Sequence, residues 1–259
     1  MVRRRSLRAR VLGGETIVGT FLLAFPGAAV ARAAAGAGAD FVLIDGEHTG
    51  FGWETMTPVL TATRAGGSTP FVRLPAASRE NIALALDIGA VGLMIPMVGT
   101  AAEAAAIASW ARYPPQGVRG TMFGLAAHDF DVVEPVAAMK KSNAETIVMV
   151  QIETAEALEN VEEIAAVPGV DILWVGHFDL TTSMGIPTQF DHPTYLAALD
   201  RIVAAGRANG KPVGFLTSGP EDARSLVDRG FSVLAYGSDL GIYRQALRTG
   251  LEGIAEALG

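Results

Sequence analysis

The chain has 259 residues, a formal charge of −7 at pH 7 and a hydrophobic content of 50%. This length and apolar content fit one (β/α)8 barrel with a sizeable core. The acidic balance disfavours a nucleic-acid partner, since proteins that bind the phosphate backbone carry a basic patch. No stretch approaches about 18 uninterrupted apolar residues, so no membrane association is predicted. We therefore expect one metabolic α/β domain over residues 1–259, located in the cytoplasm.

Residue types that are absent or sparse narrow the chemistry. The chain has no cysteine, so a thiolate nucleophile or zinc–thiolate site is excluded and a metal would bind through oxygen or imidazole ligands. Lys140, Lys141 and Lys211 do not end predicted strands, where the Schiff-base lysine of a barrel would stand. The sequence therefore favours metal-assisted enolisation over imine catalysis.

Short apolar runs alternate with longer Ala-rich segments of helical periodicity, a pattern typical of βα units around a parallel sheet. The predicted strands are residues 16–21, 41–44, 71–74, 92–95, 146–151, 172–175, 213–216 and 233–236. The predicted helices include residues 54–64, 78–87, 101–111, 154–167, 194–209, 221–228 and 239–257. Residues 112–141 break the periodicity, and we expect a long active-site loop there with a helix around 132–141. The alternation predicts a single TIM barrel.

Polar side chains end four of the predicted strands, on the side where a TIM barrel has its active site. They are Asp45 and His48 after the second strand, Arg73 in the third, Gln151 and Glu153 in the fifth, and His177 and Asp179 after the sixth. Acid, base, cation and amide should therefore meet at one mouth of the barrel.

Glu153 and Asp179 could together hold a hard divalent ion such as Mg²⁺ or Mn²⁺ and leave coordination positions for a bidentate 2-oxo acid. The alternative is that Glu153 caps the following helix and Asp179 caps a turn. The amide of Gln151 beside them favours the metal site.

Arg73 lies in an apolar strand, where a guanidinium needs an anion, so it suits a substrate carboxylate or a developing enolate oxygen. A simple ion pair at the barrel rim is the alternative. His48, three residues after Asp45, could be a general base tuned by that carboxylate. We interpret His177 as a pocket residue rather than a metal ligand.

Six motifs in this order closely resemble those of the HpcH/HpaI aldolase family, the class II pyruvate aldolases, over nearly the whole chain. They are Asp45-Gly46-Glu47-His48, Val72-Arg73-Leu74-Pro75, the run from Tyr113 to Gly120, Gln151-Ile152-Glu153-Thr154, the run from Val167 to Asp171, and the run from Gly176 to Leu180.

The resemblance implies a barrel of the phosphoenolpyruvate/pyruvate type that cleaves a 4-hydroxy-2-oxo acid to pyruvate and an aldehyde through an enolate, with Mg²⁺, Mn²⁺ or Co²⁺ as cofactor. It implies that Glu153 and Asp179 bind the ion beside Gln151, that Arg73 binds the keto oxygen, and that His48 paired with Asp45 moves protons. The implied substrate contacts also include Gly176, His177, Phe178 and Leu216.

The resemblance further implies a homo-oligomer, typically a hexamer of paired barrels that exchange the last helix, residues 239–257. In such an assembly Asp87 would help to shape the neighbouring subunit's site.

The sequence departs from the family pattern at His177-Phe178, where the usual loop has proline and a small residue, at Thr181-Thr182, and over residues 121–128. Because of these changes, the resemblance does not determine which aldehyde the enzyme uses. One alternative function is a citrate-synthase-like or decarboxylating enolate enzyme on the same barrel. Another is a non-catalytic binding barrel, against which the joint presence of Asp45, His48, Arg73, Glu153 and Asp179 argues.

Overall fold

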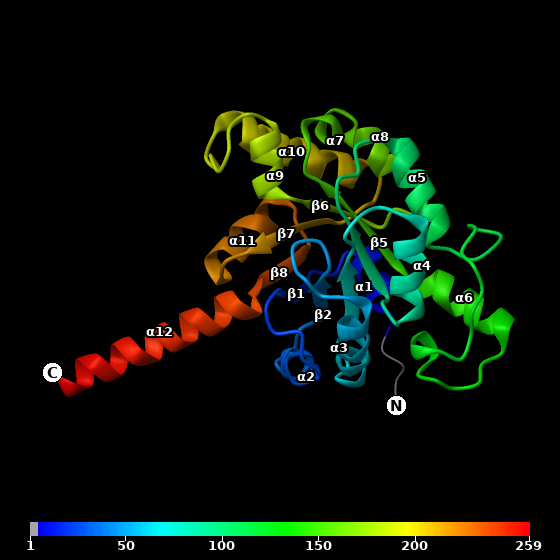
Figure 1. The fold of residues 1–259 in the computed structure, drawn as a ribbon. Helices are drawn as coiled ribbons and strands as arrows, with labels where there is room; N and C mark the ends of the chain where they lie inside the picture. Colours follow the sequence, from blue (N-terminus) through cyan, green and yellow to red (C-terminus); the bar gives the residue numbers. More distant parts are fainter. Residues whose placement is uncertain (1–4) are drawn as a thin grey trace.

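The computed structural model describes residues 5–259, in which eight parallel strands close into one barrel (Figure 1). The strands follow chain order around the barrel, and the last pairs with the first. They are β1 (Ile17–Leu22), β2 (Phe41–Asp45), β3 (Thr69–Arg73), β4 (Gly92–Ile95), β5 (Ile147–Ile152), β6 (Ile172–Val175), β7 (Val213–Thr217) and β8 (Val233–Ser238). The predicted TIM barrel is confirmed, because every predicted strand is present with ends within two residues of the prediction.

Helices surround the barrel and connect its strands (Figure 1). They are α1 (Leu7–Leu12), α2 (Ala28–Gly36), α3 (Trp53–Ala65), α4 (Arg79–Asp87), α5 (Ala101–Trp110), the 3₁₀ turn η1 (Ala126–His128), α6 (Pro135–Glu145), α7 (Ala155–Glu159), α8 (Val161–Ala166), α9 (His177–Ser183), α10 (Pro193–Ala208), α11 (Pro220–Arg229) and α12 (Asp239–Leu258). The helix predicted over 154–167 is two helices, because Asn160 leaves helical geometry with ψ at 11°. Sequence periodicity did not predict α1, α2 or α9.

The apolar core has two layers. The larger one packs the outer faces of the strands against the helices, and the smaller one fills the barrel lumen. In the lumen the rings of Phe41 and Phe71 lie 5.0 Å apart, and Gly92 leaves the room that Phe71 occupies, since a Cβ there would meet that ring at 2.2 Å. Leu7 and Val11 of α1 belong to this inner layer. Because side chains fill the lumen, the functional residues lie at the ends of the strands.

The segment between α5 and β5 lies at the base of the barrel, so the prediction that it forms a loop over this chain's own active site is wrong. Arg119 of this segment pairs with Asp87 at the end of α4, with 2.7 Å between Nη2 and Oδ1. Arg64 at the end of α3 donates to the carbonyl oxygens of Ala126 and Gly89. Arg64 lies just before β3, Asp87 and Gly89 lie just before β4, and the segment leads into the start of β5. Helix α5 has already carried the chain back to the strand beginnings.

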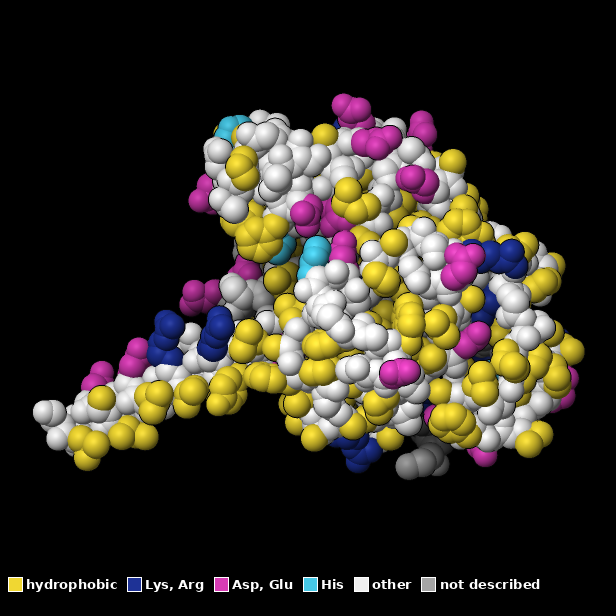
Figure 2. All heavy atoms as spheres, viewed as in Figure 1, with side chains coloured by type: hydrophobic (Ala, Val, Ile, Leu, Met, Phe, Trp, Pro, Cys, Tyr) yellow, Lys and Arg dark blue, Asp and Glu magenta, His cyan; other side chains and the backbone are white. Residues whose placement is uncertain are grey.

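Helix α12 extends away from the barrel (Figure 1), and Asp239 is its one buried residue. Five large exposed side chains recur along it, and Figure 2 shows hydrophobic atoms in a row on this helix. They are Tyr243, Leu247, Leu251, Ile254 and Leu258. Over residues 5–259, no helix is both long enough and apolar enough to cross a membrane.

Candidate active site

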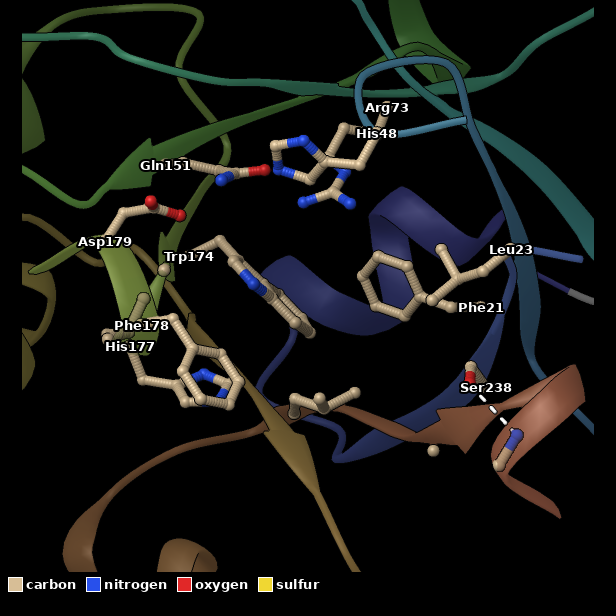
Figure 3. A pocket seen from close by; sticks show the side chains of 15 residues that line it. Phe21, Leu23, His48, Arg73, Gln151, Trp174, His177, Phe178, Asp179 and Ser238 are labelled. Atoms are coloured by element: carbon tan, nitrogen blue, oxygen red, sulfur yellow. Dashed lines mark hydrogen bonds between the residues drawn. The ribbon is translucent and has the colours of Figure 1, made fainter. Parts of the chain in front are cut away.

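A cavity of about 560 Å³ opens at the carboxyl ends of the strands (Figure 3). Most of the predicted site residues line it: His48, Arg73, Gln151, Gly176, His177, Phe178, Asp179 and Leu216. Figure 3 shows His48, Arg73, Gln151 and Asp179 along one side, while Phe178 and Trp174 lie below them. The cavity therefore has a polar side and an apolar side.

Arg73 is held on the polar side by two carboxylates from β2 and the loop that follows it. Asp45 pairs with Arg73 in the strand register, is fully buried, and accepts from Arg73 Nε at 2.7 Å. Arg73 Nη1 lies 3.3 Å from Glu47 Oε2. Asp45 also accepts from the backbone amides of Glu47 and His48, which fixes the turn after β2. Asp45 and Glu47 thus position the Arg73 guanidinium, which faces the cavity.

His48 does not pair with Asp45 through its ring, which corrects the predicted dyad. Asp45 contacts His48 at the backbone amide only, because the Asp45 carboxylate is directed into the sheet toward Arg73. The His48 side chain is 61% exposed, and its Nε2 lies 3.6 Å from Glu47 Oε2. Glu47 is therefore the carboxylate nearest this imidazole.

Glu47 is a site residue that the sequence reasoning did not single out, although it lies inside the first motif. Burial raises the pKa of Glu47 above its ordinary value, and the charge of Arg73 partly opposes that rise. One oxygen, Oε2, is buried with no hydrogen bond among the described residues. Its place next to His48 in that motif was the sequence signal that could have identified it.

Glu153 lies directly after β5, behind the cavity wall, and is almost fully buried. Its Oε1 accepts from the backbone amide of Met97 at 2.6 Å, and its Oε2 contacts the Gln151 side-chain amide. Burial raises the pKa of Glu153 to about 7, and the Met97 amide opposes the rise. The negative charges of Glu47 and Asp179 raise it further. Three carboxylates therefore share this corner, an arrangement that a bound cation would stabilise.

The donors in this corner fit a hard divalent cation. Asp179 is exposed in the first turn of α9 and lines the cavity near Gln151 (Figure 3). Gln151 Oε1 is buried and has no hydrogen-bond partner among residues 5–259. Across the same described range, no group of three or more His, Asp and Glu side chains has metal-binding geometry. A metal here would therefore be held by two carboxylates, Glu153 and Asp179, and water and substrate oxygens would complete the coordination of Mg²⁺ or Mn²⁺.

Gly176 makes room for the Glu153 carboxylate. A Cβ at Gly176 would lie 2.3 Å from Glu153 Oε2, a distance that real side chains do not tolerate. The glycine is therefore required by the buried carboxylate opposite it.

His177 packs among aromatic rings, in keeping with its interpretation as a pocket residue. Its ring stacks on Phe215 at 5.2 Å between centroids, with an interplanar angle of 26°. Burial lowers the pKa of His177, which favours the neutral imidazole.

Asp87, which the resemblance assigns to a neighbouring subunit's site, does not line this chain's cavity. It ends α4, whose carboxyl end precedes β4 at the base of the barrel, and it pairs there with Arg119. Because helices of a TIM barrel run back toward the strand beginnings, their last residues lie far from the mouth. Asp87 can therefore act at a reaction only in another subunit.

The barrel, with carboxylates, an amide and a guanidinium at the carboxyl ends of its strands, is typical of a TIM-barrel enzyme that binds an oxygen-rich anion. The family model described as HpcH/HpaI aldolase/citrate lyase matches residues 19–246. The chain is 38% identical over 210 residues to the 5-keto-4-deoxy-D-glucarate aldolase of Citrobacter koseri, covering 81% of each sequence. The chain belongs to the HpcH/HpaI aldolase/citrate lyase family.

Solved structures agree with this assignment. The HpcH/HpaI aldolase from Desulfitobacterium hafniense superposes with a TM-score of 0.91 at 30% identity, covering 98% of both chains. The citrate synthase SbnG superposes with a TM-score of 0.86 at 28% identity, covering 97% of this chain and 98% of its own. The chain is accordingly a carbon–carbon lyase of the aldolase type, in a family whose members depend on a divalent metal.

Proposed function

We propose that the cavity binds a 4-hydroxy-2-oxo acid with its 2-oxo acid end toward Glu153 and Asp179, which hold Mg²⁺, Mn²⁺ or Co²⁺. The observation that carries this assignment is the burial of Glu153 beside two further carboxylates, because a bound cation would stabilise such a corner. Asp179 follows the adjacent strand β6 and lines the cavity, whose wall covers Glu153. A carboxylate and a keto oxygen are suitable ligands for the remaining positions.

The bound ion would supply Lewis-acid polarisation of the keto group. Arg73 donates an N–H to the keto oxygen, where negative charge develops as the carbon–carbon bond breaks. Asp45 and Glu47 hold the guanidinium, so little reorganisation is needed during the reaction. Gln151, on the same side of the cavity as Arg73, orients the oxo acid.

His48 moves the protons. In the cleavage direction, His48 takes the proton of the C4 hydroxyl through an intervening water, and the C3–C4 bond breaks to release the aldehyde. The bonding electrons remain on C3 as an enolate, which takes one proton at C3 to become the methyl group of pyruvate. The exposed ring of His48 and its nearness to Glu47 support this role.

The assembly that we propose is a homo-oligomer, a hexamer in which paired subunits exchange α12. The exposed apolar row of α12 needs a covering surface. Each barrel offers a groove of about 460 Å³ beside β1 and α2, lined largely by small and apolar side chains such as Val18, Leu22, Ala33 and Ala34. A second copy's α12 lying in this groove would cover both surfaces. Asp87 would then serve a neighbouring site.

Proton NMR of pyruvate in D₂O tests the donor and the metal together. Protein with Mg²⁺, Mn²⁺ or Co²⁺ should exchange the pyruvate methyl protons for deuterium, and EDTA should abolish the exchange. Glu153→Gln should also abolish it, whereas substitution of the exposed Glu80 by Gln should leave it intact. Absence of exchange with every metal would contradict the proposal that the enzyme forms the enolate of pyruvate.

A citrate-synthase-like reaction is the second candidate, favoured by the similarity to the SbnG structure. It would join the methyl carbon of an acetyl thioester to the keto carbon of oxaloacetate, with water hydrolysing the thioester to release the thiol, instead of splitting a hydroxy-oxo acid. Product analysis with each substrate pair distinguishes the two, because the aldolase forms an adduct only from pyruvate and an aldehyde.

A further inference from the structure

The apolar side of the cavity is formed around Phe178 at the start of α9. We propose that Phe178 determines aldehyde specificity and that the enzyme selects an acceptor aldehyde with an uncharged, apolar substituent. This inference rests on the proposed function, because it assigns the aldehyde half of the same substrate.

Phe178 stands at the rim of the cavity with 54% of its surface exposed. Its ring contacts His177 at 4.4 Å between centroids with an interplanar angle of 41°, and Phe190 at 5.4 Å with an angle of 80°. The exposed face therefore belongs to a ring that is fixed from two sides.

The rings behind Phe178 continue into the core. Phe190 contacts the buried Tyr195 at 6.0 Å, and Phe215, which stacks on His177, contacts the buried Phe231 at 5.3 Å. A surface anchored in this way loses little side-chain entropy when a ligand packs on it. The arrangement favours a preformed apolar subsite.

Phe178 also lies away from the cation of the cavity. In Figure 3, Arg73 and His48 lie on the polar side of the cavity, whereas Phe178 lies on the apolar side with Trp174. Trp174 and Leu216 line the cavity with Phe178. The first carbons of the substrate belong with Asp179 and Arg73, so the aldehyde substituent extends along the apolar side.

Among this chain's own lining residues, a charged substituent would find no free partner. Among residues 5–259, Arg73 is the one arginine or lysine that lines this cavity, and Asp45 and Glu47 already engage it. A second carboxylate would lose hydration without a compensating ion pair. An alkyl or aryl group would instead bury apolar surface against Phe178, Trp174 and Leu216. The lining therefore favours the apolar aldehyde.

The test compares butanal with succinic semialdehyde, which carries a carboxylate on a chain of similar length. The rate of aldol addition to pyruvate with Mg²⁺ gives kcat/KM for each aldehyde. We expect the wild-type enzyme to prefer butanal by about tenfold or more, within the range that a hydrophobic pocket can provide. Phe178→Ala should reduce that ratio by about tenfold, Phe178→Leu should largely keep it, and Phe178→Arg should shift it toward succinic semialdehyde.

Phe130→Ala is the matched control, because Phe130 is 67% exposed in the segment at the base of the barrel and should not affect the ratio. A wild-type preference for succinic semialdehyde, or an equal loss for both aldehydes in Phe178→Ala, overturns the inference. Methyl exchange of pyruvate in the absence of aldehyde distinguishes failure of the proposed function from failure of the inference about Phe178. No exchange by wild-type enzyme overturns the proposed function together with this inference, whereas exchange without aldehyde preference overturns the inference alone.

Discussion

Asp45 and Arg73 face each other across neighbouring strands, and the Arg73 Nε donates to the fully buried Asp45 Oδ1 at 2.7 Å. The strand register fixes both residues, so the ion pair is part of the barrel itself. Asp45 also accepts from two backbone amides and remains hydrogen-bonded when Arg73 is changed. Arg73 is therefore a residue whose substitution should affect turnover more than folding.

Arg73→Ala should lower kcat for pyruvate release by about 10²-fold or more, because one donor to the developing oxyanion is lost. Steady-state assays coupled to pyruvate reduction measure this effect, and circular dichroism checks the fold. Arg79→Ala is the matched control, since Arg79 is exposed at the start of α4. Full activity in Arg73→Ala would contradict the assigned role.

The raised pKa of Glu153 predicts a pH-dependent stability in the metal-free enzyme. Its ordinary value is 4.5 and burial raises its pKa to about 7. Between these values the unfolded chain has lost the proton that the folded chain still holds, so the free energy of unfolding falls as pH rises. The fall is at most about 1.4 kcal/mol per pH unit from this group, and it levels off above pH 7.

Urea denaturation in EDTA from pH 4.5 to 8 measures this loss, with Glu153→Gln as the reference that lacks the titrating group. Adding Mn²⁺ at pH 7.5 should restabilise the wild-type enzyme and have little effect on the variant. Identical pH profiles for both proteins would show that Glu153 is ionised normally.

Gly176→Ala should weaken metal binding by about tenfold or more, because the new Cβ would collide with Glu153 Oε2 and displace that carboxylate. Isothermal titration with Mn²⁺ gives the affinity. Gly219→Ala is a suitable control, since a Cβ at Gly219 meets nothing within 4 Å and its φ of 172° is open to any residue. Equal affinities in the two variants would argue against Glu153 as a ligand.

Leu251→Asp should weaken the oligomer, because it places a charge in the apolar row of α12 that we propose to dock on a second barrel. Sedimentation velocity over a range of concentrations measures the change in mass. Thr249→Asp places the same charge on the opposite face of the helix and should keep the assembly. If both variants keep the wild-type mass, α12 is not the exchanged element.

The barrel could be predicted from sequence because its strands are short apolar runs such as Phe41–Asp45, bounded by polar strand ends. The same pattern located Arg73, Gln151 and Asp179, since the carboxyl ends of the strands share one mouth. Helix α1 was missed because six residues are too few for periodicity to be recognised.

Contacts within the mouth were harder to predict. The spacing of Asp45 and His48 does not reveal that the carboxylate meets a backbone amide while the ring lies nearer Glu47. The amide of Met97 reaches Glu153 across a separation of 56 residues, which no local pattern encodes. The hexamer, the helix exchange and the cytoplasmic location stay predictions.

The cavity takes residues from both ends of the chain, and its wall includes Phe21 of β1 and Ser238 of β8, which are partners in the register that closes the barrel. A nascent chain therefore cannot assemble this wall until its last strand has been synthesised and has paired with its first. Catalytic turnover can thus report ring closure during refolding, and a fragment that ends before β8 would lack one edge of the reaction chamber.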